Sequence, residues 1–336
     1  MQPPDQPQVQ TGVQRPRELH SIAELRAMTS GALVAVVIDA LVEAHRGVGP
    51  DEPTRTVRFA SDVADDWEPP ADALARLAGR LGPEGSRRLG RTLVDVIALA
   101  RPDRLPAAVL EDVLFATGLL QASQVLPAAA RAVIDLADGW ARDADRLQVV
   151  LLMVIKGMRG ASDATDAARV LLGSPDLQPR FALDALEVLL ADPGMPMEEA
   201  LDEASARMSL MMWPSKRPRF ESRLRALARS AIAPRPLPDV ARALEVLLGE
   251  ARGHDTGHPL GLLVRILLCE PDSPFRGERT GRGARLVRRA DGASVAWRVA
   301  DAAADAFLQP QAAFRAVARS PLVHQSDWAS EEGAVF

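Results

Sequence analysis

Apolar residues recur along most of this chain at a nearly constant spacing. One central apolar residue can be chosen in each segment, and the series is Val94, Val113, Val133, Val150, Val170, Val188, Met208, Leu227, Val246 and Val264. Successive members are 17 to 20 residues apart, with a mean of about 19. Within the segments, apolar residues repeat at three and four positions, which is the period of one face of a helix. The pattern predicts helices almost throughout the chain.

Two helices and their connections would therefore repeat about every 38 residues, which is in the range of helical-hairpin repeats. Short amphipathic helices cannot bury their apolar faces alone, and stacked hairpins bury them against each other. In general form the chain resembles HEAT-like arrays. We predict an all-α fold, either a right-handed helical-hairpin (HEAT-like) α-solenoid or an irregular helical bundle, with room for one short β-hairpin near residues 284–299.

Residues that start and stop helices stand between the apolar segments. Ser21 and Glu24 have the spacing of a capping box, so ordered structure should begin near residue 20. Prolines stand near the predicted helix starts at Pro70, Pro106, Pro127, Pro179, Pro196 and Pro238. Glycines stand near predicted helix ends at Gly157, Gly173 and Gly249.

The same signals divide the chain into five segments. A disordered Gln/Pro-rich tail (1–18) precedes an N-terminal helical segment (19–46). An acidic Pro-rich linker (47–70) leads to the helical-repeat array (71–270). An Arg-rich loop and C-terminal helices (271–336) follow.

Two structures compete for the residues after the Arg-rich loop. Asp291 and Gly292 stand between two apolar stretches, which suits a hairpin with a tight turn near 284–299. A helix from Ser294 to Leu308 would use the same residues, and the sequence favours the helix.

The composition limits the class of protein. Hydrophobic residues make up 47% and charged residues 25%, as in soluble folded proteins, which excludes wholesale disorder. The net charge of −5 is too small for the bulk attraction that dedicated nucleic-acid binders use. A single cysteine, Cys269, and the absence of Asn predict a reducing cytoplasm. Only two of the forty basic residues are lysine, which indicates GC-rich bacterial coding.

No segment has the form of an export signal or a membrane span. The longest apolar stretches, Gly31 to Val42 and Val149 to Ile155, are well short of the roughly 20 residues that cross a bilayer. We therefore predict that both are buried helices and that the chain has no membrane partner.

Charge is divided along the array. The segment from Asp184 to Glu203 has seven acidic residues and no basic one, whereas Lys216 to Arg235 has seven basic residues and one acidic one. One interpretation is a solvated basic face that pairs with the adjacent acidic helix. The other is a surface for anions or an acidic partner, since arginine forms bidentate pairs with carboxylate and phosphate. The candidate partner- or anion-binding residues are Arg217, Arg219, Arg223, Arg225, Arg229, Arg276, Arg279, Arg282, Arg285, Arg288 and Arg289.

The segment Gly253-His-Asp-Thr-Gly-His-Pro259 resembles the signature of metal-dependent HD phosphohydrolases, an all-helical family. The resemblance implies that His254 and Asp255 would bind a metal that activates water, with His258 as a phosphate contact. The family also needs an upstream histidine, and none occurs between His45 and His254. The alternative is a polar loop between two helices.

Three functions follow, and we favour the first. It is a non-catalytic helical-repeat scaffold or adaptor that binds a protein partner in a bacterial complex, without a cofactor. The second is a nucleic-acid-binding subunit that uses the arginines of 216–235 and 276–289, with the Arg-rich loop as the wing of a winged helix. Against a wing, residues 259–268 are almost entirely apolar and should lie in a core rather than in a DNA groove. The third is the HD-type hydrolase.

Overall fold

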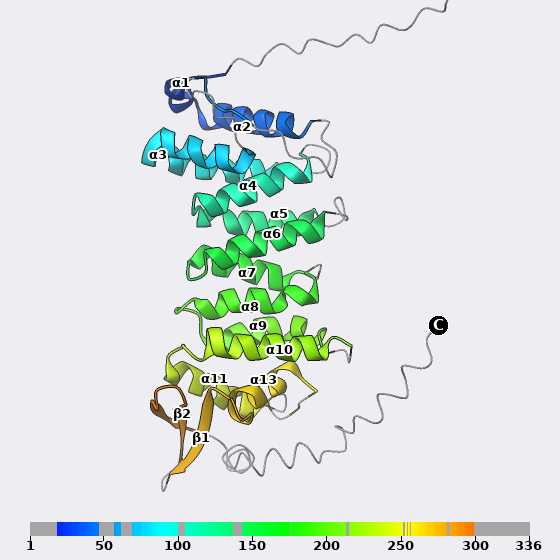
Figure 1. Cartoon of the computed structure of the whole chain (residues 1–336), viewed down its shortest axis with the longest axis vertical. Helices are drawn as coiled ribbons and strands as arrows, with labels where there is room; N and C mark the ends of the chain where they lie inside the picture. Colours follow the sequence, from blue (N-terminus) through cyan, green and yellow to red (C-terminus); the bar gives the residue numbers. More distant parts are fainter. Residues whose placement is uncertain are drawn as a thin grey trace, which may run out of the picture. The chain divides into compact units, whose positions relative to one another are not determined.

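The described part of the chain is mostly helical, as predicted, with one small sheet after the last helix (Figure 1). The chain divides into two compact units with the boundary between Thr92 and Leu93. The predicted tail, most of the acidic linker and the chain after residue 298 lie outside the described residues. The computed structural model describes residues 19–46, 57–61, 69–99, 105–136, 143–175, 177–212, 215–250, 253, 255, 257–280 and 283–298.

The first unit holds α1 (Ile22–Ala27), α2 (Ser30–His45) and most of α3 (Pro70–Ala98). The capping box is confirmed, because Ser21 Oγ accepts from the Glu24 N–H at 3.2 Å and the Glu24 carboxylate accepts from the Ser21 N–H at 2.6 Å. Helix α3 bends at Gly82, whose φ of 76° is left-handed. Pro83 follows, and its missing N–H cannot continue the helix before it.

The second unit continues from the end of α3 with helices at the predicted spacing. Each of the ten central apolar residues lies in a different helix, in chain order from α3 to α13. Gly157, Gly173 and Gly249 are the last residues of α6, α7 and α11, as predicted. The elements are α4 (Ala107–Leu119), η1 (Ser123–Val125), α5 (Leu126–Asp135), α6 (Ala144–Gly157), α7 (Ser162–Gly173), η2 (Pro179–Phe181), α8 (Ala182–Ala191), α9 (Met197–Ser209), α10 (Arg217–Leu227), η3 (Ala228–Ile232), α11 (Leu237–Gly249) and α13 (Pro259–Leu268).

The helices of the second unit pack in two layers. In one layer α4, α6, α8, α10 and α13 contact one another in that order, and in the other α5, α7, α9 and α11 do so. Leucines such as Leu151, Leu186 and Leu244 are fully buried in the packed helices. Each helix therefore packs mainly against helices near it in the sequence, which Figure 1 shows as a succession of short helices.

The Arg-rich segment after α13 folds as an antiparallel sheet of β1 (Phe275–Thr280), β2 (Gly283–Arg288) and β3 (Ser294–Trp297), in the order β1-β2-β3. The prediction of a hairpin near 284–299 is confirmed. The competing prediction, a helix that begins at Ser294, is wrong for residues 294–298. Gly292, with φ of 70°, permits the tight turn. Trp297 is buried and β3 packs on α11, so tertiary packing outweighs the helix propensity of the flanking alanines.

The two apolar helices α13 and α6 differ in burial. Every residue of α13 is buried except Arg265, which confirms that residues 259–268 belong to a core and not to a DNA groove. In α6, however, Val149 is 38% exposed and Met153 is 60% exposed, so the prediction that this stretch is wholly buried is wrong at these two positions. No helix in the described ranges is both long and apolar enough to span a bilayer.

Candidate docking surface

Ion pairs join successive helices in both layers of the second unit. Arg146 of α6 lies 2.9 Å from Glu111 of α4, and Lys156 of α6 lies 2.7 Å from Glu187 of α8. Corresponding pairs in the other layer are Arg169–Glu203 and Arg242–Glu198. In all four pairs the basic side chain is more exposed than its carboxylate partner.

The basic helix α10 pairs with the acidic helix α8, as one of the two interpretations predicts. Arg223 Nη2 lies 2.7 Å from Asp184 Oδ2, and Arg223 Nη1 donates to the Arg180 carbonyl at 2.6 Å. The two segments of opposite charge are therefore neighbours in one layer, and this arginine has an intramolecular role.

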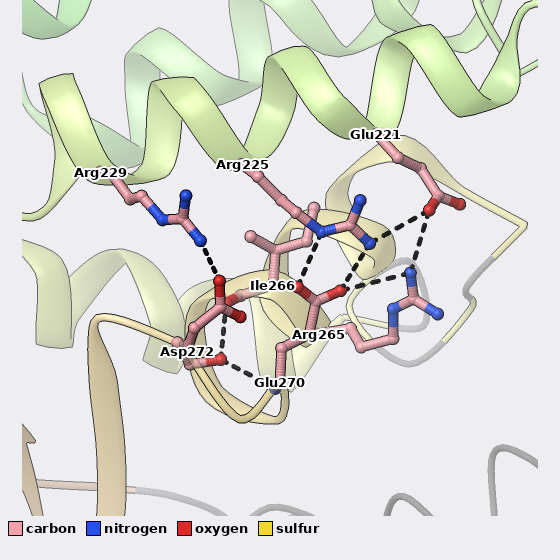
Figure 2. A network of polar contacts seen from close by, with 8 residues as sticks. Glu221, Arg225, Arg229, Arg265, Ile266, Glu270 and Asp272 are labelled. Atoms are coloured by element: carbon pink, nitrogen blue, oxygen red, sulfur yellow. Dashed lines mark hydrogen bonds and ion pairs between the residues drawn. The ribbon is translucent and has the colours of Figure 1, made fainter.

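A second group of ion pairs joins α10 to α13 and to the turn that follows it (Figure 2). Arg225 binds both oxygens of Glu270 through Nε and Nη2, each at 2.8 Å, in the bidentate geometry of an arginine–carboxylate pair. Arg265 Nη2 lies 3.5 Å from Glu221 Oε2 and 3.6 Å from Glu270 Oε1. Arg229 pairs with Asp272. The carboxylates of Glu221 and Glu270 thus hold the half-buried Arg225 and Arg265, whereas Arg229 and Asp272 are both more than half exposed.

The charges around Glu221 change its acidity. Burial of the Glu221 carboxyl raises its pKa, but the hydrogen bond from Arg217 and the positive charges of Arg265, Arg217 and Arg225 outweigh burial. The pKa of Glu221 is therefore lower in the folded chain than its ordinary value of 4.5.

We expect Glu221 to contribute to the pH dependence of stability. A lowered carboxyl pKa stabilises the fold above pH 4.5, and this contribution is lost as the pH falls through the folded-state value. From about pH 6 to about pH 3, the wild type should lose more free energy of unfolding than Glu221→Gln. Urea denaturation at both pH values measures the difference. Equal losses in the two proteins would contradict the assignment.

The arginines of the sheet also have partners within the chain. Arg276 on the same strand and Arg285 opposite on β2 both pair with Glu278, with closest N–O distances of 2.7 Å and 2.5 Å. The hydrogen bond from Arg285 lowers the pKa of Glu278 despite partial desolvation. Arg288 donates to the Arg235 carbonyl at 2.6 Å. Arg289 Nε donates to the Phe275 carbonyl at 3.4 Å, Arg279 is also partnered, and Arg282 lies outside the described residues.

The structure thus divides the predicted arginine set. Arg219 of α10 is exposed and makes no hydrogen bond or ion pair with the described residues, whereas Arg217 pairs with Glu221 at 3.0 Å. The other described members all have intramolecular partners.

The motif that resembles HD phosphohydrolases lies at the start of α13. His254 lies outside the described residues, while Asp255 is exposed and its carboxylate accepts from the Gly257 N–H at 2.7 Å. His258 is the N-cap of α13, where Nδ1 accepts from the Leu260 N–H at 3.3 Å. Among residues that the structure describes, no three His, Cys, Asp or Glu side chains lie together as a metal site. Asp255 and His258 each accept a local backbone hydrogen bond, as a polar loop between two helices would provide.

Cys269 follows α13, and we expect it to be unreactive in the folded chain. Burial raises the pKa of its thiol to about 11, and the nearby Arg265 offsets this only in part. At about pH 8, iodoacetamide should modify the native protein at least about a hundredfold more slowly than the urea-unfolded chain. Mass spectrometry detects the change directly, because the chain has one cysteine. Rapid modification of the native protein would contradict a raised pKa of this half-buried thiol.

The clearest unpartnered surface is apolar and lies on α4 and α6. Phe115 and Leu119 on α4 are 37% and 55% exposed, and Val149 and Met153 on α6 are exposed to a similar degree. We call these four residues the α4–α6 patch. The two helices are neighbours in one layer, and within each helix the two residues are four positions apart and share one face. Grouped exposed apolar side chains of this size mark interaction sites in soluble proteins.

The four patch residues are not among the functional residues predicted from the sequence. In α4 the predicted series contains Val113, which lies on the buried face of the helix. The available signal was that Phe115 and Leu119 lie off that face and are also large and apolar. A helix that is apolar on a second face needs a second surface to cover it.

No protein-family model, curated protein or solved structure matches the chain.

Proposed function

We propose that this chain is a non-catalytic helical-repeat scaffold or adaptor that binds a protein partner within a bacterial cytoplasmic complex. The proposal includes a HEAT-like α-solenoid for the second unit. Its support is the two-layer packing, in which helices contact their neighbours along the sequence, as stacked hairpins do. The single cysteine supports the reducing compartment.

The observation that carries the docking role is the α4–α6 patch. Four large apolar side chains on two adjacent helices are exposed, although most residues of these types in the described chain are buried. Burying them against a partner would contribute about 25 cal/mol for each Å² removed from water. The arginines, in contrast, are mostly occupied by intramolecular carboxylates and carbonyls.

Capture from the native host with tagged full-length protein tests the proposal. The patch variant Leu119→Glu/Met153→Glu should capture at least about tenfold less of the partner than the wild type, because each change places a charge in an apolar contact. The matched variant Arg219→Glu/Arg229→Glu changes one exposed residue of α10 and one of η3, and should still capture most of the partner. Circular dichroism melting checks that both variants are folded.

Two results would overturn the proposal. One is that no protein is enriched over a tag-only control. The other is that the captured material is nucleic acid, removed by nuclease and lost in the arginine variant, which would favour the second predicted function.

A further inference from the structure

Met153 differs from the other described methionines in its exposure to solvent. It lies in α6 and is 60% exposed. The other methionines in the described ranges are buried, at 8% exposure or less, or only partly exposed. The buried ones are Met195, Met197, Met208 and Met211, and the partly exposed ones are Met28, Met158 and Met212. A reagent dissolved in water therefore reaches Met153 more readily than any of these.

The single cysteine does not compete with Met153 for oxidants. The Cys269 thiol is half-buried and its pKa is raised to about 11, so only about one thiol in ten thousand is ionised at pH 7. The thiolate is the form that reacts with peroxides. The thioether of Met153 carries no proton, and its sulfur keeps its lone pairs at every pH. We therefore expect Met153 to be oxidised before Cys269.

The fold should tolerate an oxygen atom on Met153. An exposed side chain can place the sulfoxide oxygen in water, where it is hydrogen-bonded at no cost to packing. The buried methionines lack this freedom: Arg169 Nη2 already donates to Met195 Sδ at 3.1 Å, and Met197 is fully buried. A packed interior has no space for an added atom. Oxidation at Met153 is therefore compatible with the folded chain.

The same oxygen would change the α4–α6 patch. Met153 is the most exposed of the four patch residues, so it offers a large share of the apolar area that docking would cover. A sulfoxide is polar, and burying a polar group without a hydrogen bond costs free energy. Methionine is common at adaptable protein-binding surfaces, and its oxidation disrupts them.

We propose that Met153 is an oxidation site at which a peroxide switches off partner docking on the α4–α6 patch. With hydrogen peroxide, a lone pair of Met153 Sδ attacks one peroxide oxygen, the S–O bond forms as the O–O bond breaks, and the other oxygen leaves as water after proton transfer. The thioether is oxidised to the sulfoxide and the peroxide is reduced. A methionine sulfoxide reductase reverses the change. The inference rests on the proposed function and specifies how the same patch is regulated.

Limited oxidation of the full chain with hydrogen peroxide at about pH 7 tests the site itself, without a partner. Lys156 lies between Met153 and Met158, so trypsin separates the two for mass spectrometry. Met153 should gain one oxygen at least about tenfold faster than the buried methionines, and circular dichroism melting should not change. Faster oxidation of Cys269 or of a buried methionine, or unfolding when Met153 is oxidised, would overturn the inference.

Capture from the host tests the effect on docking, with each protein compared with its own untreated sample. Peroxide treatment should lower capture by the wild type at least about fivefold, and methionine sulfoxide reductase should restore it. Met153→Leu keeps an apolar side chain without sulfur, so its capture should not respond to peroxide. The matched control Met158→Leu should respond as the wild type does. Equal responses of the Met153→Leu and Met158→Leu variants would contradict the switch.

The failure of this inference and the failure of the scaffold role give different results. If a protein is captured and its capture is unchanged when Met153 is oxidised, the scaffold survives and the switch is wrong. If nothing is captured from the host, the scaffold is wrong and the switch fails with it.

Discussion

Replacing Arg235 with alanine is expected to lower the free energy of unfolding by about 3–5 kcal/mol. Its side chain is only 6% exposed and connects three parts of the second unit. Nη1 donates to the Leu190 carbonyl and Nη2 to the Met195 carbonyl, each at 2.5 Å, while Nε lies 2.6 Å from Asp239. The variant leaves a partly buried carboxylate and two carbonyls without these donors, and buried groups without partners are costly.

Urea denaturation followed by circular dichroism measures this loss. The matched control is Arg229→Ala, because Arg229 and Asp272 are both more than half exposed, and it should change stability by less than about 1 kcal/mol. Arg235→Lys keeps the charge but not the three-way donor geometry, so its loss should be intermediate. Similar losses at positions 235 and 229 would show that Arg235 does not connect these elements.

Phe220→Ala is expected to lower the free energy of unfolding by about 3–5 kcal/mol, since Phe220 of α10 is fully buried and its loss leaves a cavity. The same substitution at Phe115 should cost about 1 kcal/mol, because that ring already meets solvent. In partner binding the order should reverse, with Phe115→Ala causing the larger loss. If Phe115→Ala destabilises as much as Phe220→Ala, Phe115 belongs to the core and the patch is incorrectly assigned.

Much of the helical architecture could be predicted from the sequence because it depends on local patterns. The apolar spacing from Val94 to Val264 placed one residue in each of ten helices. Ser21 and Glu24 predicted a cap because their hydrogen bonds join residues three apart. These features depend on helix geometry, which nearby residues determine.

The ion pairs between helices, the strand β3 and the exposed side of α6 depend on contacts between residues that are distant in the sequence. Arg225 and Glu270 are 45 positions apart, and no local pattern shows that they form a bidentate pair. The strand β3 forms because Trp297 is buried and β3 packs on α11. The exposure of Met153 depends on which side of α6 the neighbouring helices cover, so a continuous apolar stretch could not reveal it.

Hydrogen exchange of the full chain, free and in complex with the partner captured from the host, tests the docking surface most directly. The account predicts slower amide exchange in residues 107–119 and 144–157 of the complex, with little change in residues 237–249 and 283–297. Protection confined to α10, α11 and the sheet, with α4 and α6 unchanged, would contradict it.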